Sequence, residues 1–128
     1  MTQPAPATPR PSATIVMVRA SDAGPEVLLV KRRAGDAFGN AYTFPGGVID
    51  PDESDARPVC SGLSEEEANA LLGVDHGLDY YTAGIRELFE ETGIRLVRDA
   101  DGHWPADDSV YAGQRDAVDR CELAWSDF

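Results

Sequence analysis

The chain has 128 residues, a hydrophobic fraction of 42% and a formal net charge of -12 at pH 7, a combination typical of one globular domain. The charge is uneven: residues 51–128 hold nineteen acids against six Lys or Arg, and residues 1–50 hold four against five. This balance argues against a nucleic-acid polymer as partner, because such binding needs a basic surface. An anionic small molecule remains a candidate substrate, provided that a metal ion neutralises the local charge.

The positions of the cysteines, histidines and apolar runs exclude further classes of protein. Cys60 and Cys121 are far apart without CxxC spacing, and His76 and His103 are equally isolated, so neither a zinc site nor a disulfide framework is predicted. Two free thiols are typical of a reducing compartment, and we expect a cytoplasmic protein. No apolar stretch approaches the length of a membrane span, so no membrane partner is expected.

The first fifty residues predict a lead, a hairpin and a glycine-rich segment. Residues 1–11 are rich in proline and lack the apolar region of a signal peptide, which predicts a disordered lead. Residues 14–20 (TIVMVRA) and 26–32 (EVLLVKR) are aliphatic runs separated by a turn signal, which predicts a β-hairpin. After a loop at 34–40, residues 42–50 (YTFPGGVID) combine a short strand with a Pro-Gly-Gly turn, where glycines let the backbone approach a ligand.

A short helix is predicted after Ser64. The sequence SEEEANALLG places Ser64 three residues before Glu67, which is the spacing of a capping box, and Gly73 supplies a stop. The acids in its first turn interact favourably with the helix dipole and so stabilise the helix. We interpret them as a solvated face and not as a metal site.

A second helix, beginning near Asp79, is predicted to carry the motif RELFEETG at residues 86–93. Its three glutamates are spaced at i, i+3 and i+4 and so share one helical face: Glu87, Glu90 and Glu91. The apolar residues of the same segment form the stripe that docks the helix on a core, and Gly93 ends it: Ile85, Leu88 and Phe89. The pattern alone allows a solvated acidic face or a divalent cation site, since Mg²⁺ is held by a few carboxylates and substrate phosphates.

The last third predicts a strand at 94–98 (IRLVR), a loop at 99–108 and an amphipathic helix over 108–128. The apolar residues that recur at helical spacing in this last segment are Val118, Cys121, Trp125 and Phe128.

Two separated stretches together resemble the box of the Nudix hydrolases, G-x5-E-x7-R-E-U-x-E-E-x-G-U, where U is a bulky aliphatic residue. The second half is complete from Arg86 to Ile94, and the first half runs from Gly47 to Glu53, preceded by the FPG that commonly introduces it. The resemblance implies an α/β (α+β) fold, an α/β/α sandwich around a mixed sheet, over residues 12–128.

The box departs from the family pattern in one place. Thirty-two residues separate Glu53 from Arg86 where the pattern has seven, so a segment at 54–78 is inserted within the motif. A split box opening with FPGGVID is similar to the branch that includes acyl-CoA diphosphatases. We expect the insertion to lie beside the cleft as a specificity element or lid.

The resemblance is weak after residue 98, because the family has several strands and a closing helix there. We therefore expect residues 1–128 to be the N-terminal part of a longer enzyme or a truncated product. The alternative to an enzyme is a catalytically incomplete fragment that binds a nucleotide or a protein partner.

The family's site residues are implied at the matching positions of this chain. Metal ligands (Mg²⁺ or Mn²⁺) would be Glu87, Glu90, Glu91 and the Gly47 carbonyl, with Glu90 as a further ligand or as the base for water. Arg86 would pair with Glu53 and hold the loop of Gly47 against the helix. Substrate phosphates would meet Lys31, Arg32 and Arg33, which from the pattern alone are equally a solvated strand end.

The reaction implied is metal-dependent attack of water on a diphosphate bond in a nucleoside diphosphate linked to another moiety. CoA and acyl-CoA are the first substrates expected from the branch.

Overall fold

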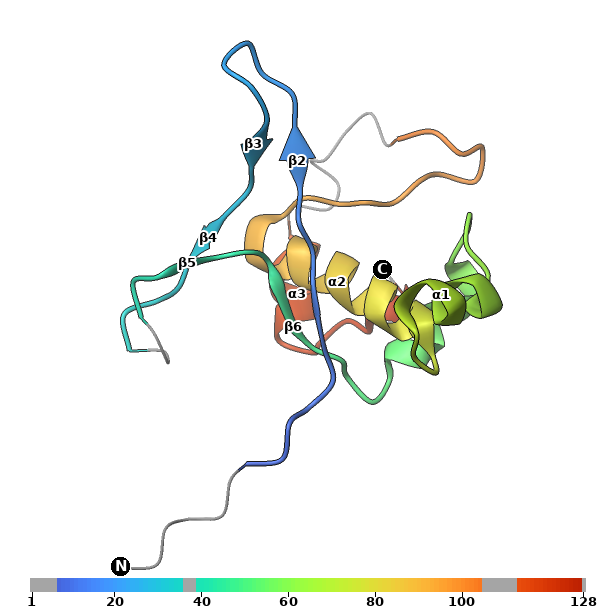
Figure 1. Ribbon diagram of the computed structural model, residues 1–128. Coiled ribbons are helices and arrows are strands. Elements are labelled where there is room, and N and C mark those ends of the chain that lie inside the picture. The colour runs from blue at the N-terminus through green and yellow to red at the C-terminus, as the bar shows by residue number, and fades with distance from the viewer. Residues whose placement is uncertain (1–6, 36–38, 105–112, 128) are drawn as a thin grey trace, which may run out of the picture.

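The computed structural model describes residues 7–35, 39–104 and 113–127 (Figure 1). Short strands form the N-terminal half and helices the middle of the chain, which gives the α+β class that the sequence predicts. The long helix α2 (Gly77–Thr92) packs against the ladder of β1 (Ser12–Thr14) and β6 (Gly46–Val48). This arrangement brings the two halves of the split motif together.

Strand pairing is antiparallel throughout the described residues. The ladders join β1 to β6, β2 (Val18–Arg19) to β3 (Glu26–Val27), and β4 (Val30–Lys31) to β5 (Tyr42–Thr43). The β2–β3 pair confirms the predicted hairpin. The described strands form three separate two-stranded antiparallel ladders, so the expected mixed sheet has no parallel pair among them. A parallel pair would need a long crossover connection to a further strand.

The insertion folds as two short helices beside the start of α2. It comprises the 3₁₀ helix η1 (Glu53–Val59) and α1 (Glu65–Leu72). Ser64 and Glu67 make the predicted capping box, and Gly73 ends α1 in a left-handed conformation, as expected.

Two contacts fix this insertion on α2. The Arg57 guanidinium donates to both carboxylate oxygens of Asp79 at 2.7 and 2.8 Å. The Gly77 N–H meets the side-chain oxygen of Asn69, and a Cβ at Gly77 would collide with the backbone of Ala68. Glycine at position 77 therefore allows α1 and α2 to approach closely.

Helix α2 begins at Gly77, two residues before the expected Asp79, and ends where Gly93 takes the predicted left-handed conformation. Its apolar stripe forms much of the core: Ala83, Leu88 and Phe89 are at most 2% exposed.

Two predictions for the C-terminal third are wrong. Residues 94–98 form no strand, since they have no ladder partner among the described residues; Leu96 and Val97 instead line a cavity beside α2. Of the expected helix over 108–128, the described residues 113–127 form only α3 (Gln114–Asp119) and the 3₁₀ helix η3 (Trp125–Asp127). Cys121 has a φ of 55°, which interrupts a right-handed helix.

Parts of other predictions lie outside the described residues. These are residues 1–6 of the lead, 36–38 of the glycine-rich loop, 105–112, and Phe128. Residues 7–11 are exposed, and the Pro11 carbonyl accepts a hydrogen bond from the Ile49 N–H at 3.1 Å. Within the described helices, none has both the length and the apolar character needed to cross a membrane.

Candidate functional site

Arg86 connects the two halves of the motif. Its side chain is 7% exposed, and its Nε and Nη2 donate to Glu53 Oε2 at 3.2 and 3.1 Å. Nη2 also donates to the Val48 carbonyl at 3.1 Å, at the end of β6. The predicted Arg86–Glu53 pair is thus present, and it ties η1 and β6 to α2.

The same guanidinium also orders two of the motif glutamates. Nη1 of Arg86 lies 3.2 Å from Glu87 Oε1 and 3.2 Å from both carboxylate oxygens of Glu90. Arg86 therefore offsets like charge that would otherwise be concentrated on this face of α2.

The turn at Gly46 and Gly47 contacts the face of α2 that bears Glu87, Glu90 and Glu91, here called the glutamate face. The Gly46 N–H donates to Glu91 Oε2 at 3.2 Å, and Gly46 has a φ of 157°. A Cβ at Gly47 would collide with the carboxylate of Glu87. A residue with a side chain at position 47 would therefore displace the Glu87 carboxylate.

Burial shifts the ionisation of this group. Loss of solvent raises the pKa of four carboxyls above their usual 4.5: Glu53, Glu87, Glu90 and Glu91. Burial opposes the charge of Arg86 most strongly, but the hydrogen bond to Glu53 and the negative charges of Glu53, Glu90 and Glu87 together outweigh it and raise the pKa of Arg86 above its usual range. Arg86 consequently stays charged, while the glutamates favour a neutralising partner.

The oxygen donors suit a hard divalent cation in type, since Mg²⁺ and Mn²⁺ prefer carboxylates, carbonyls and water. Glu53 also has a buried Oε1 without a hydrogen-bond partner in the described structure. Among the described residues, however, the three motif glutamates do not form a group with one oxygen each within 4.8 Å: Glu87 and Glu90 both contact Arg86 Nη1, whereas Glu91 Oε2 accepts from the Gly46 N–H. Binding of a cation by all three requires these side chains to turn toward each other.

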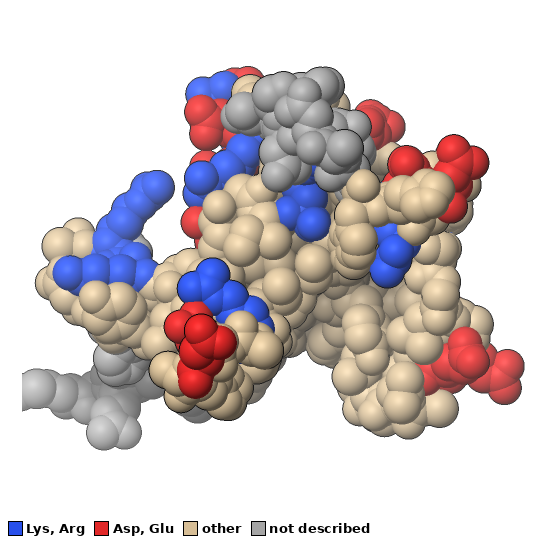
Figure 2. Space-filling view, turned by 90° about the horizontal axis from the view of Figure 1, so that it is seen from above, with Lys and Arg blue, Asp and Glu red and all other residues tan. Residues whose placement is uncertain are grey.

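Of the three basic residues at the end of β4, only Arg32 affects the ionisation of a motif glutamate. Lys31, Arg32 and Arg33 are all exposed, and the charge of Arg32 lowers the pKa of Glu91 against the larger effect of burial. Among the described residues, Lys31 and Arg33 form no ion pair with an acid. Figure 2 shows basic side chains on the lobe at the left, on the side where Figure 1 places β4 and β5.

Sequence reasoning missed two contributors. Asp50 Oδ2 lies 3.4 Å from Arg86 Nη2, and its position within GGVID gave a usable signal. Arg115 at the start of α3 donates from Nε to the Glu90 carbonyl at 2.7 Å, in the last turn of α2, where carbonyls lack helical partners. No motif marks Arg115 in the sequence.

A separate acidic group lies in the loop after residue 98. Asp99, Asp101 and His103 bring their ligand atoms within 4.8 Å of one another, but all three are exposed. Asp99 Oδ1 also accepts hydrogen bonds from the backbone N–H groups of Asp101 and His103 at 3.0 and 2.8 Å. These bonds account for the arrangement as a turn.

Comparison with solved structures gives a likeness to the crystal structure of a NUDIX hydrolase from Alicyclobacillus acidocaldarius. The TM-score is 0.61 at 24% sequence identity, over 80% of this chain and 46% of that chain. The present chain therefore spans about half the length of that structure. No protein-family model matches the sequence, and no curated protein does so. This likeness, together with the arrangement of helices and strands described above, shows that the chain has a Nudix-type α+β fold.

Proposed function

We propose that this chain is a Nudix hydrolase that cleaves the diphosphate bond of a nucleoside diphosphate linked to another moiety, with Mg²⁺ or Mn²⁺ as cofactor. One observation carries the proposal. Arg86 joins Glu53 and the end of β6 to the face that bears Glu87 and Glu90, although the two halves of the motif are separated by the insertion. Ionisable groups whose pKa is shifted by burial and by charged neighbours gather preferentially at functional sites, and four such carboxyls lie at this face of α2.

The chain's own residues divide the work of such a reaction. Glu87, Glu91 and the Gly47 carbonyl would hold the cation, and Glu90 would be a further ligand or accept the proton of the attacking water. When bound, the cation would neutralise phosphoryl oxygens and lower the pKa of water. Arg86 would orient the glutamates without touching substrate.

Basic side chains at the end of β4 supply charge for the substrate phosphates. Arg32 has the better support, because its charge already acts on Glu91. Lys31 and Arg33 would engage the more distant phosphate oxygens of a longer substrate.

For the substrate we propose CoA or an acyl-CoA, on the ground of the split box. Hydrolysis of CoA adds water across the diphosphate and releases 4'-phosphopantetheine and adenosine 3',5'-bisphosphate. The test incubates the protein with CoA, acetyl-CoA, nucleoside triphosphates and Mg²⁺ or Mn²⁺, and identifies products by mass spectrometry. Both CoA products should accumulate; cleavage of nucleoside triphosphates alone would contradict the CoA assignment.

Matched variants separate this site from background hydrolysis. Glu87→Gln combined with Glu91→Gln should abolish turnover. Glu66→Gln on α1 is the control, because Glu66 is an exposed acid of a neighbouring helix. Equal activity in the double variant and the control would overturn the assignment of the site.

A second function is a nucleotide-binding module without turnover. It is favoured by the engagement of Glu87 and Glu90 with the same Nη1 of Arg86, because a side-chain cation of the protein then already neutralises both carboxylates. Saturable binding of CoA by calorimetry, with no product after prolonged incubation with either metal, would select this alternative.

A further inference from the structure

The carbonyl of Glu90 lies where the regular hydrogen bonding of α2 ends. In a longer helix this carbonyl would accept a hydrogen bond from the N–H of Ile94. That N–H instead donates to Thr92 Oγ1 at 3.1 Å, and the Glu90 carbonyl accepts from Arg115 Nε at 2.7 Å. A side chain of α3 therefore completes the last turn of α2.

Arg115 lies across the end of α2 and is partly buried. Its Cδ would be 3.9 Å from a Cβ placed on Gly93, the residue that ends α2 in a left-handed conformation. Among the described residues, Arg115 forms no ion pair with an acid. Its charge therefore acts on the carboxyl end of the helix dipole, where a cation is stabilising.

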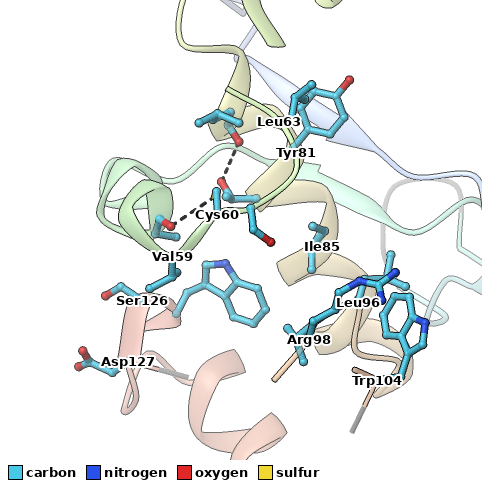
Figure 3. Close-up of a pocket in the computed structure, with 16 residues that line it drawn as sticks. Val59, Cys60, Leu63, Tyr81, Ile85, Leu96, Arg98, Trp104, Ser126 and Asp127 are labelled. Atoms are coloured by element: carbon cyan, nitrogen blue, oxygen red, sulfur yellow. Dashed lines mark hydrogen bonds between the residues drawn. The ribbon is translucent and has the colours of Figure 1, made fainter. Parts of the chain in front are cut away.

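The segment that carries Arg115 is itself packed on α2. Figure 1 shows α3 beside the end of α2, and Val118, one turn after Arg115, is 4% exposed. Further along, the ring of Trp125 lies 6.3 Å from that of Phe89. Figure 3 shows Ser126 on the wall of a cavity that α2 also lines. The segment thus contacts α2 at several points, which holds Arg115 against the helix end.

The last turn of α2 sets the relative position of two motif glutamates. The N–H of Glu91 bonds to the carbonyl of Glu87, as in any α-helix, so the two carboxylates keep their spacing only while this turn is formed. Helix ends open more readily than helix interiors, because their terminal carbonyls lack helical partners. Opening of this turn would also act against the bond from the Gly46 N–H to the Glu91 carboxylate.

We propose that Arg115 is a positioning residue of the metal site. Through its bond to the Glu90 carbonyl it keeps the last turn of α2 formed, and so keeps Glu87 and Glu91 at the spacing from which they bind one cation. Arg115 contacts neither the substrate nor the cation in this role. The inference rests on the proposed function, because it takes Glu87 and Glu91 as metal ligands.

Three variants test this role through the affinity for Mn²⁺, measured by electron paramagnetic resonance. Arg115→Met keeps an apolar stem across the helix end but removes the donor, and it should raise the Kd about tenfold, as loss of a group that holds metal ligands typically does. Arg115→Lys keeps a cationic donor and should restore the Kd to within about threefold of the unaltered protein. Arg120→Ala is the matched control, because Arg120 is an exposed arginine of the same segment that pairs with Glu122.

Hydrogen exchange without metal distinguishes positioning from a general loss of stability. In Arg115→Met, exchange at the amides of Glu90, Glu91 and Thr92 should accelerate at least about tenfold, while exchange at residues 82–86 of α2 should change less than about twofold. Equal acceleration along the whole of α2 would overturn the positioning role.

The failure of this inference differs from failure of the proposed function. An unchanged Kd in Arg115→Met, or an equal rise in Arg120→Ala, would overturn the role of Arg115 if Glu87→Gln combined with Glu91→Gln still weakens Mn²⁺ binding. If that double variant binds Mn²⁺ as well as the unaltered protein, the proposed metal site is wrong and the positioning role is overturned with it.

Discussion

Arg86 donates two hydrogen bonds to one oxygen of Glu53, a residue 33 positions earlier in the chain, and both side chains are almost completely buried. Breaking a buried ion pair from one side leaves the other charge without its partner. Glu53→Ala should therefore lower the free energy of unfolding by about 2 to 3 kcal/mol, less than for an isolated pair because Glu87 and Glu90 still contact Arg86. Urea unfolding measures this change. Asp52→Ala, at an exposed neighbour, should cost under about 0.5 kcal/mol; equal losses in the two variants would show that the pair has no special role.

A substitution at Gly47 tests whether the turn at Gly46 and Gly47 positions the motif glutamates for metal binding. Gly47→Ala places a methyl group against the Glu87 carboxylate, and because that group can move away, stability should change little while metal affinity falls about tenfold or more. Gly113→Ala is the control, since its φ is -83° and nothing lies within 4 Å of an added Cβ. Melting curves with and without Mn²⁺ measure both quantities. If Mn²⁺ raised the melting temperature of Gly47→Ala as much as that of the unaltered protein, Gly47 would have no role in metal binding.

The α1 cap predicts a pH dependence. Hydrogen bonds from the backbone and hydroxyl of Ser64 lower the pKa of Glu67 below its usual 4.5. The stabilisation is therefore present above the unfolded pKa and disappears as the pH falls through the lower folded value. Glu67→Gln should be less stable than the unaltered protein at pH 7, and the difference should vanish in acid. Urea titrations at several pH values, with Glu66→Gln for comparison, measure it; a difference that grows in acid would contradict the cap.

The two thiols should differ in reactivity. Burial raises the pKa of Cys60, whose Sγ–H donates to the Ala56 carbonyl at 3.4 Å, whereas Cys121 is exposed. Because the thiolate is the reactive form, iodoacetamide should alkylate Cys121 about tenfold faster at neutral pH. Mass spectrometry of tryptic peptides over time gives both rates. Faster labelling of Cys60 would contradict its placement beside η1.

Local chemistry explains which elements the sequence predicted. Ser64, Glu67 and Gly73 define α1 through bonds within one short segment, and Gly93 ends α2 in the same way. The Arg86–Glu53 pair was predictable although it spans 33 positions, because both residues belong to one recognisable motif.

Elements that depend on distant partners were not predictable. Residues 94–98 have the composition of a strand, but a strand also needs a neighbour, and Leu96 and Val97 contribute to the cavity wall instead. The positive φ of Cys121 interrupts a pattern that otherwise favours a helix. The contact between Arg115 and the Glu90 carbonyl joins two segments with no shared motif.

The central claim is that Glu87 and Glu91, and not another acidic group, hold the divalent cation. Electron paramagnetic resonance with Mn²⁺ tests it directly, since bound and free Mn²⁺ give different signals. We expect Glu87→Gln combined with Glu91→Gln to weaken Mn²⁺ binding at least about tenfold. Asp99→Asn combined with Asp101→Asn, which alters the exposed group in the loop after residue 98, should leave the affinity unchanged. Loss of binding in the Asp99 and Asp101 variant, with full binding in the glutamate variant, would contradict the account.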